Sequence, residues 1–126
     1  MLQKGLTHTS VMTVEELHSA ANVGSGDMPV LATPMMMALM ENAAMLAVDQ
    51  ELPQNETTVG GYIESSHLRP TPIGAEIYAT ATLENIDGKK LEFHVIAKQD
   101  DVTLGEGRHV RYIVDREKFM NRIKKD

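Results

Sequence analysis

An apolar segment in the first half of the chain limits the possible folds more than any other feature. The segment, ATPMMMALMENAAMLAV, runs from Ala32 to Val48 and is apolar at every position except Thr33, Glu41 and Asn42. A helix of this composition has no polar face, so the rest of the protein must wrap around it. Glu41 then needs a partner, because an isolated buried carboxylate is costly in free energy.

Prolines mark both ends of this expected helix. Thr33-Pro34 is a favourable start, since a threonine can accept a backbone hydrogen bond at the N-cap and proline fits the first turn. Pro53 predicts an end near Glu51, because proline cannot continue a helix. The expected helix therefore spans residues 33–51.

The remaining chain is predicted to be mainly β-structure. Apolar and polar residues alternate from Ile77 to Glu84, and the alternation resumes at Leu91 after an Asp87-Gly88 turn, which predicts a hairpin. The expected strands are 6–14, 57–68, 77–84, 91–98 and 102–114, with short helices at 15–22 and 116–125. Residues 24–27, GSGD, form an expected loop and a candidate lid.

These elements predict an α+β fold with one domain over residues 1–126, since so short a chain cannot fill two cores. Alternation gives the sheet one apolar face, and the long helix is the only element apolar enough to cover it. We expect an antiparallel sheet wrapped around one long central helix.

Charge and composition narrow the classes of function. Aspartate and glutamate total 18 against 12 lysines and arginines, so the net charge of −6 argues against a general binder of nucleic acid or anionic membranes. The chain has no cysteine, which excludes disulfides, a thiolate nucleophile and cysteine-ligated zinc. The start, MLQKGLTHTS, lacks a signal-peptide pattern, and no histidines show metal-ligand spacing. We expect a soluble cytoplasmic protein without a metal.

Polar residues beside or within apolar segments are the candidates for chemistry. Glu41 is either solvated or ion-paired, or it is a base or nucleophile held in mid-helix. His67 ends a predicted strand, where it is either a surface residue or an imidazole that orients or protonates a reacting group. Thr33 is either the helix cap alone or also faces the reacting centre. Gly60-Gly61 allows a β-bulge or presents a backbone N–H to an oxyanion.

The other candidates carry weaker signals. The methionines near the helix start are adaptable core residues or line an acyl pocket, and Met37 is the one assigned to the substrate. Basic residues are expected in solvent, where some could meet the phosphates of a nucleotide-bearing substrate: Lys89, Lys90, Arg108, Arg111 and Arg116. His109 is expected on a surface or sheet face.

Several motifs in order resemble a known family. The pattern ATPxMxxLMExAA, then TTVGG, HLxxTPxG, DGKKLEF, GEGxHxR and VDREKF, is similar to the hotdog-fold thioesterases related to fluoroacetyl-CoA thioesterase. The similarity extends from about Thr9 to Ile123. The resemblance implies a sheet wrapped around one helix, in a homodimer or a dimer of dimers with active sites at the subunit interface.

The resemblance also implies a reaction and a set of site residues. Thr33, Glu41 and His67 match the catalytic set of the family, and Gly60 matches a glycine that contacts the substrate. The implied reaction is hydrolysis of an acyl-CoA thioester, with coenzyme A entering only as part of the substrate. Glu41 would act as nucleophile or as base for water, His67 would polarise or protonate, and Thr33 would hydrogen-bond the carboxylate or the substrate carbonyl. Gly61, Met37 and Arg111 are the further residues assigned to the substrate.

The segment before Thr33 departs from the family pattern. The fluoroacetyl-specific enzyme carries phenylalanine gating residues there, whereas Asn22 to Leu31 contains none, so a short-to-medium acyl group is expected instead. Two alternatives remain at this point. A hydratase of the same fold usually carries a longer histidine and aspartate motif, which is absent, and a non-catalytic protein could bind a CoA ester or another small ligand.

Overall fold

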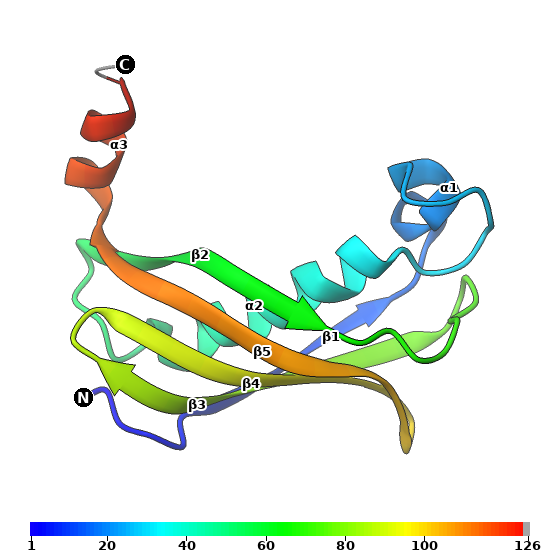
Figure 1. Ribbon diagram of the computed structural model, residues 1–126, viewed down its shortest axis with the longest axis horizontal. Helices are drawn as coiled ribbons and strands as arrows, with labels where there is room; N and C mark the ends of the chain where they lie inside the picture. Colours follow the sequence, from blue (N-terminus) through cyan, green and yellow to red (C-terminus); the bar gives the residue numbers. More distant parts are fainter. Residues whose placement is uncertain (125–126) are drawn as a thin grey trace.

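The computed structural model describes residues 1–124, which form one five-stranded sheet and helices beside it (Figure 1). In chain order the elements are β1 (Thr7–Thr13), the 3-10 helix η1 (Glu16–His18), α1 (Ala20–Val23), α2 (Thr33–Asp49), β2 (Glu56–Ser65), β3 (Glu76–Asp87), β4 (Lys90–Gln99), β5 (Val102–Asp115) and α3 (Arg116–Lys124). The expected helix at 15–22 is broken at Ser19, whose side chain caps α1 by accepting from the N–H of Asn22. Lys125, placed in the expected terminal helix, lies outside the described residues.

The sheet is antiparallel throughout, with strand order β1-β3-β4-β5-β2. The three strands β3, β4 and β5 follow one another as hairpins, as their alternation predicts. Strand β2 does not pair with β3, the next strand in the chain. Instead β2 pairs with β5, and residues 66–75 carry the chain across to β3. Consequently β1 and β2 are the two edges of the sheet.

Helix α2 lies against the inner face of the curled sheet. Its buried residues are Met36, Leu39, Met40, Ala43, Ala44, Ala47 and Val48. They pack with the alternating core residues of the β3–β4 hairpin, namely Ile77, Ala79, Ala81, Leu83, Leu91, Phe93, Val95 and Ala97. This packing removes the apolar surface of both elements from water, which is the main stabilising contribution to such a core.

One face of α2 is not wrapped, in contrast to the expectation from its composition. Met37, Glu41 and Met45 are half-buried and Ala38 is exposed in the single chain. Met37, Glu41 and Met45 are four residues apart and Ala38 is three residues before Glu41, so the four positions form a continuous stripe along the helix. The stripe runs on the side of α2 toward the edge strand β2, where Gly60 approaches Glu41.

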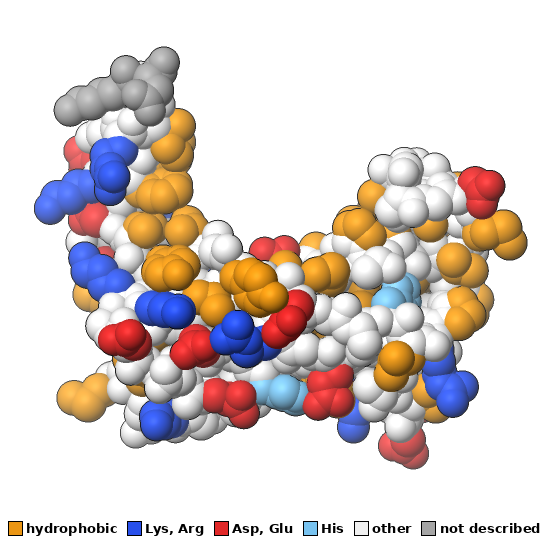
Figure 2. All heavy atoms as spheres, viewed as in Figure 1, with side chains coloured by type: hydrophobic (Ala, Val, Ile, Leu, Met, Phe, Trp, Pro, Cys, Tyr) orange, Lys and Arg blue, Asp and Glu red, His pale blue; other side chains and the backbone are white. Residues whose placement is uncertain are grey.

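The molecule has a hollow on one side. Helix α3 and the α1 segment rise at opposite ends of the sheet, and the surface between them is concave (Figure 2). Strand β2 lies along this hollow in Figure 1. The exposed edge of the sheet and the uncovered stripe of α2 therefore belong to the same region of the molecule.

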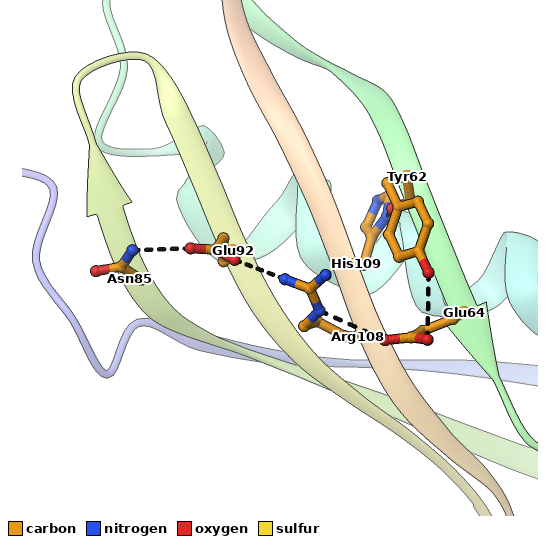
Figure 3. A network of polar contacts seen from close by, with 6 residues as sticks. All are labelled: Tyr62, Glu64, Asn85, Glu92, Arg108 and His109. Atoms are coloured by element: carbon orange, nitrogen blue, oxygen red, sulfur yellow. Dashed lines mark hydrogen bonds and ion pairs between the residues drawn. The ribbon is translucent and has the colours of Figure 1, made fainter.

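A network of polar side chains links the strands on the outer face of the sheet (Figure 3). Arg108 of β5 contacts Glu92 of β4 at 2.7 Å and Glu64 of β2 at 3.5 Å. Tyr62 donates to Glu64 at 3.2 Å, and the Arg108 guanidinium lies 5.4 Å from the centre of the Tyr62 ring. The network is largely exposed, so each pair contributes little to stability, but together they favour the observed register of β2 on β5.

Candidate active site

Thr33 and His67 meet at the start of α2. The Thr33 hydroxyl oxygen Oγ1 lies 2.6 Å from the His67 ring nitrogen Nδ1. His67 reaches this position because the chain continues beside β5 after β2 ends, with Ser66 and Leu68 donating backbone hydrogen bonds to the carbonyls of Glu106 and Leu104. Thr33 was expected to cap the helix, but the N-cap is Ala32, and no side chain caps this end. The Thr33 hydroxyl is therefore committed to the histidine.

The environment of His67 favours a neutral imidazole. Burial lowers the pKa of His67, and the nearby Arg69 backbone acts on it in the opposite direction. Within residues 1–124 the other ring nitrogen, Nε2, is buried and has no hydrogen-bond partner. A neutral imidazole carries one proton, so the form protonated at Nε2 leaves Nδ1 free to accept a hydrogen bond from Thr33. This arrangement can orient the hydroxyl and move a proton through it.

A cavity of about 290 Å³ opens beside the Thr33–His67 pair. It is lined by residues from the α1 segment, the helix start and the turn after β2: Ala20, Ser25, Val30, Leu31, Thr33, His67, Leu68, Arg69 and Pro70. Ser25 belongs to the loop predicted as a lid, so that loop borders the cavity. The cavity gives a ligand access to the Thr33 hydroxyl.

Glu41 contacts the β-bulge of β2. The pairing of β2 with β5 shifts between Gly60 and Tyr62, which confirms the predicted bulge at Gly60-Gly61. A Cβ atom added to Gly60 would lie 3.1 Å from the Glu41 carboxylate oxygen Oε2, so only glycine allows this close approach without displacing Glu41. Glu41, Gly60 and Gly61 line a second cavity, together with Tyr62, Ile63 and His109.

The histidine nearest to Glu41 in this chain is His109, not His67. Of the two positions expected for His109, the structure shows the sheet face, where the residue is only 1% exposed. The expectation that Arg111 is solvated was wrong, since Arg111 is only 7% exposed. In the pairing of β5 with β4 the two residues stand opposite the core residues Phe93 and Leu91 and therefore face α2. The contact of Arg111 with substrate stays a prediction. In this structure Arg111 lies beneath the β-bulge of β2.

The site residues expected from the sequence form two separate groups in one chain. Thr33 with His67 lies at the first turn of α2, and Glu41 follows eight positions later, about 12 Å along a helix that rises 1.5 Å per residue. Met37 lies half-buried between them on the same stripe. Within residues 1–124 no group of three His, Asp or Glu side chains converges as metal ligands. Helices of the described chain are too short or too polar to cross a membrane.

Comparison with known proteins identifies the family. The model of the fluoroacetyl-CoA-specific thioesterases matches residues 14–117. The chain belongs to the fluoroacetyl-CoA thioesterase family. The fluoroacetyl-CoA thioesterase of Streptantibioticus cattleyicolor is 33% identical over 95 residues, which cover 75% of this chain and 68% of that protein. The chain is thus a member of a family of thioester hydrolases, which confirms the enzyme class that the motifs predict.

Solved structures of the family share the fold over nearly the whole chain. A structure of fluoroacetyl-CoA thioesterase superposes with a TM-score of 0.92 at 26% identity and covers 100% of this chain and 98% of that one. A hot-dog-like protein from Thermanaerovibrio acidaminovorans has a TM-score of 0.88 at 19% identity, with 98% and 92% of the two chains covered. These similarities confirm the hotdog fold, with its sheet curled around one long helix.

Proposed function

We propose that this protein is a homodimeric acyl-CoA thioesterase whose active site combines Thr33 and His67 of one subunit with Glu41 of the partner subunit. The observation that carries the proposal is the 2.6 Å contact between Thr33 and His67 beside a cavity, with Glu41 on the same helix face but about two turns away. A nucleophile or base has to lie within hydrogen-bond reach of the reacting atoms, directly or through one water. One chain alone does not bring these groups that close, and a two-fold related chain can.

Three features of the fold support the dimer. Strand β2 is an edge of the sheet with unpaired backbone groups, and it lies along the hollow between α1 and α3 (Figure 1). Such an edge is a template for pairing with another strand. The stripe of Met37, Ala38, Glu41 and Met45 is partly exposed to solvent in one chain, and a partner subunit would bury it. An antiparallel β2–β2 contact in the hollow pairs the edge, covers the stripe and brings each Glu41 toward the other subunit.

The proposed reaction is hydrolysis of a thioester bond. Glu41 removes a proton from the water that attacks the thioester carbonyl carbon, or it attacks that carbon itself to form a mixed anhydride that a water molecule then hydrolyses to the free acid. The carbon–sulfur bond breaks, and the departing CoA thiolate takes a proton from His67, which is replaced by the proton that the attacking water releases. Thr33 has one hydroxyl proton, so it donates to the substrate carbonyl or to the carboxylate when His67 is protonated at Nδ1 and donates to Thr33 Oγ1. The backbone at Gly60-Gly61 is close enough to Glu41 to contact the same carbonyl.

The acyl group that we propose is short to medium in length. The segment from Asn22 to Leu31 has no aromatic side chain, so the cavity next to Thr33 is bordered by small and aliphatic residues such as Ala20, Val30 and Leu31. Met37 on the same helix face is unbranched and adapts its shape to different chains. These side chains exclude water without selecting one acyl group.

The phosphates of coenzyme A need cations, and one cavity supplies them. Lys89, Lys118 and Arg122 line a cavity of about 330 Å³ beside Phe119 and Ile113 at the base of α3. The carboxylate in it, Asp115, is already engaged by the Asn55 amide and the Lys118 backbone N–H. In an acidic protein this concentration of positive charge fits a nucleotide phosphate, with the apolar side chains beside the adenine.

A panel of CoA esters tests the activity. Purified protein is mixed with acetyl-, butyryl-, hexanoyl- and aromatic CoA esters, and the free thiol is measured. We expect hydrolysis that is lost in Glu41→Ala and in His67→Ala. Saturable binding of the esters without release of thiol would show a binding protein instead, and full activity in both variants would contradict the proposed site.

Subunit complementation tests the composite site. Glu41→Gln and His67→Gln are each inactive as homodimers, and a mixed dimer of the two contains one intact pair only if the residues meet across the interface. We expect activity to reappear after the two inactive proteins are unfolded together and refolded. Mixtures that stay as inactive as the separate variants, with mixed dimers demonstrated by native mass spectrometry, would place both residues in one subunit's site.

A further inference from the structure

Arg111 is a buried cation whose hydrogen bonds go to neutral groups. Its Nε donates to Thr58 Oγ1 at 2.7 Å, its Nη2 to the Thr58 carbonyl at 2.8 Å, and its Nη1 to His109 Nε2 at 3.1 Å. Among residues 1–124 no carboxylate lies within the 4.0 Å ion-pair distance of this guanidinium. Burying a charge is costly unless an opposite charge compensates it, so the cation needs an anion.

His109 cannot share this positive charge. Its Nδ1 lies 2.7 Å from the carbonyl oxygen of Tyr62, which only accepts hydrogen bonds, so Nδ1 carries the proton. Its Nε2 faces an N–H group of Arg111 and must therefore be the unprotonated acceptor. Burial and the Arg111 charge both lower the pKa of His109, in agreement with a neutral ring. The tautomer is thus fixed by its two neighbours, and the ring in turn holds Arg111.

The anion nearest to this cation is Glu41, across Gly60. A Cβ atom built on Gly60 would lie 3.1 Å from Glu41 Oε2, 3.5 Å from His109 Cε1 and 3.8 Å from Arg111 Nη1. The missing side chain of this glycine therefore leaves a small space that the carboxylate and the guanidinium both face. The attraction of Glu41 raises the pKa of Arg111 and of His109 against the effect of burial.

We propose that Arg111 is a positioning residue for Glu41, held in place by Thr58 and His109, and that its buried charge attracts the Glu41 carboxylate and keeps it turned toward Gly60. The catalytic part of this proposal rests on the proposed thioesterase function. On the Glu41 side of α2, strand β5 contributes His109 and Arg111, and the bulge of β2 contributes the two glycines. Strand β1 lies at the edge of the sheet opposite β2. The titratable residue of β1, His8, is half-buried there.

A double-mutant cycle on stability tests the charge pairing without any substrate. Urea unfolding is measured for the parent, Glu41→Gln, Arg111→Met and the double variant. We expect the two substitutions to be non-additive by at least tenfold in the unfolding equilibrium constant, because each single variant leaves one buried charge uncompensated. Arg111→Gln, which removes the charge but keeps hydrogen-bond donors for Thr58, serves in the same cycle if Arg111→Met does not fold.

A matched control uses the neighbouring arginine of the same strand. Arg108 lies on the exposed outer face and pairs with Glu92 and Glu64 (Figure 3). Glu41→Gln combined with Arg108→Met should be additive. If Glu41→Gln is equally additive with Arg111→Met, Arg111 does not compensate Glu41 and the proposal is wrong, whether or not the protein hydrolyses CoA esters.

The separate effects on kcat and KM distinguish a positioning role from substrate binding. If Arg111 holds the Glu41 carboxylate in place, Arg111→Met should lower kcat at least tenfold while KM stays near that of the parent. Arg111→Lys should lower kcat less. A raised KM with an unchanged kcat would instead make Arg111 a substrate-binding residue and overturn the positioning role.

Discussion

The Thr33 hydroxyl lies 2.6 Å from His67 Nδ1, although the two residues are 34 positions apart in the chain. The contact joins the first turn of α2 to the segment that leaves β2. It uses the hydroxyl that a helix cap would otherwise use, and the start of α2 has no other side-chain cap. Because a missing cap costs roughly 1 kcal/mol, the arrangement favours function over stability at this position.

The first prediction concerns this hydroxyl. Thr33→Val removes the oxygen and keeps the shape, so we expect kcat to fall by about 10²-fold or more, within the range for loss of a positioned acid–base group. Thr33→Ser keeps the hydroxyl and should retain most of the activity. Initial rates of thiol release from the best CoA ester of the panel give kcat for the parent and the two variants. A Thr33→Val enzyme within twofold of the parent would remove the hydroxyl from the mechanism.

The second prediction concerns the bulge. Gly60→Ala places a methyl group 3.1 Å from Glu41 Oε2, closer than most side-chain contacts. The carboxylate has to move by a few tenths of an ångström or more, and we expect a loss of about tenfold to 10²-fold in kcat with a small change in melting temperature. Tyr78→Phe, on β3 and outside both cavities of the site, is the control and should leave kcat unchanged. Parent-like turnover by Gly60→Ala would mean that the position of Glu41 is not critical.

The sequence predicted the regular elements well because their signals are local. Threonine and proline marked the start of α2, and strict alternation marked the β3–β4 hairpin, whose apolar positions are all in the core. The choice of β5 as the partner of β2 is a long-range property and carried no local signal. The hydrogen bond of Thr33 with His67 is also a long-range contact. The sequence therefore did not predict that this hydroxyl bonds a histidine and does not cap the helix.

The buried pair in β5 shows a signal that was present but not recognised. His109 and Arg111 alternate in phase with Ile113, which packs against the core, so period-2 alternation already places all three on the face toward the helix. Polarity suggested a solvated face for these residues. Their burial follows from the register of β5 on β4, where they stand opposite Phe93 and Leu91.

The third prediction concerns the nucleotide end of the substrate. Neutralising the cavity at the base of α3 with Lys89→Gln and Arg122→Gln should raise KM for acyl-CoA several-fold, with kcat little changed. The same acyl group on pantetheine lacks the nucleotide phosphates, so its KM should be equal in the parent and the variant. Lys98→Gln, an exposed lysine of β4 that does not line the cavity, is the control. An equal rise in KM for both substrates would exclude phosphate recognition there.

The fourth prediction concerns stability against pH and follows from half-buried His67 and buried His109. Burial lowers the pKa of His67 and of His109 in the folded protein, whereas in the unfolded chain histidine titrates near its ordinary value of about 6.5. The unfolded state therefore binds more protons below that pH, so stability is fully present above about pH 6.5 and is lost as the pH falls toward the lowered pKa values. Each histidine contributes to this pH dependence a slope of at most about 1.4 kcal/mol of unfolding free energy per pH unit.

Urea unfolding between pH 5 and pH 8 should show this loss of stability. The slope should decrease in His109→Gln, since the glutamine amide can still accept from Arg111 and donate to the Tyr62 carbonyl. A variant that retains the full slope would show that His109 is not a source of the pH dependence.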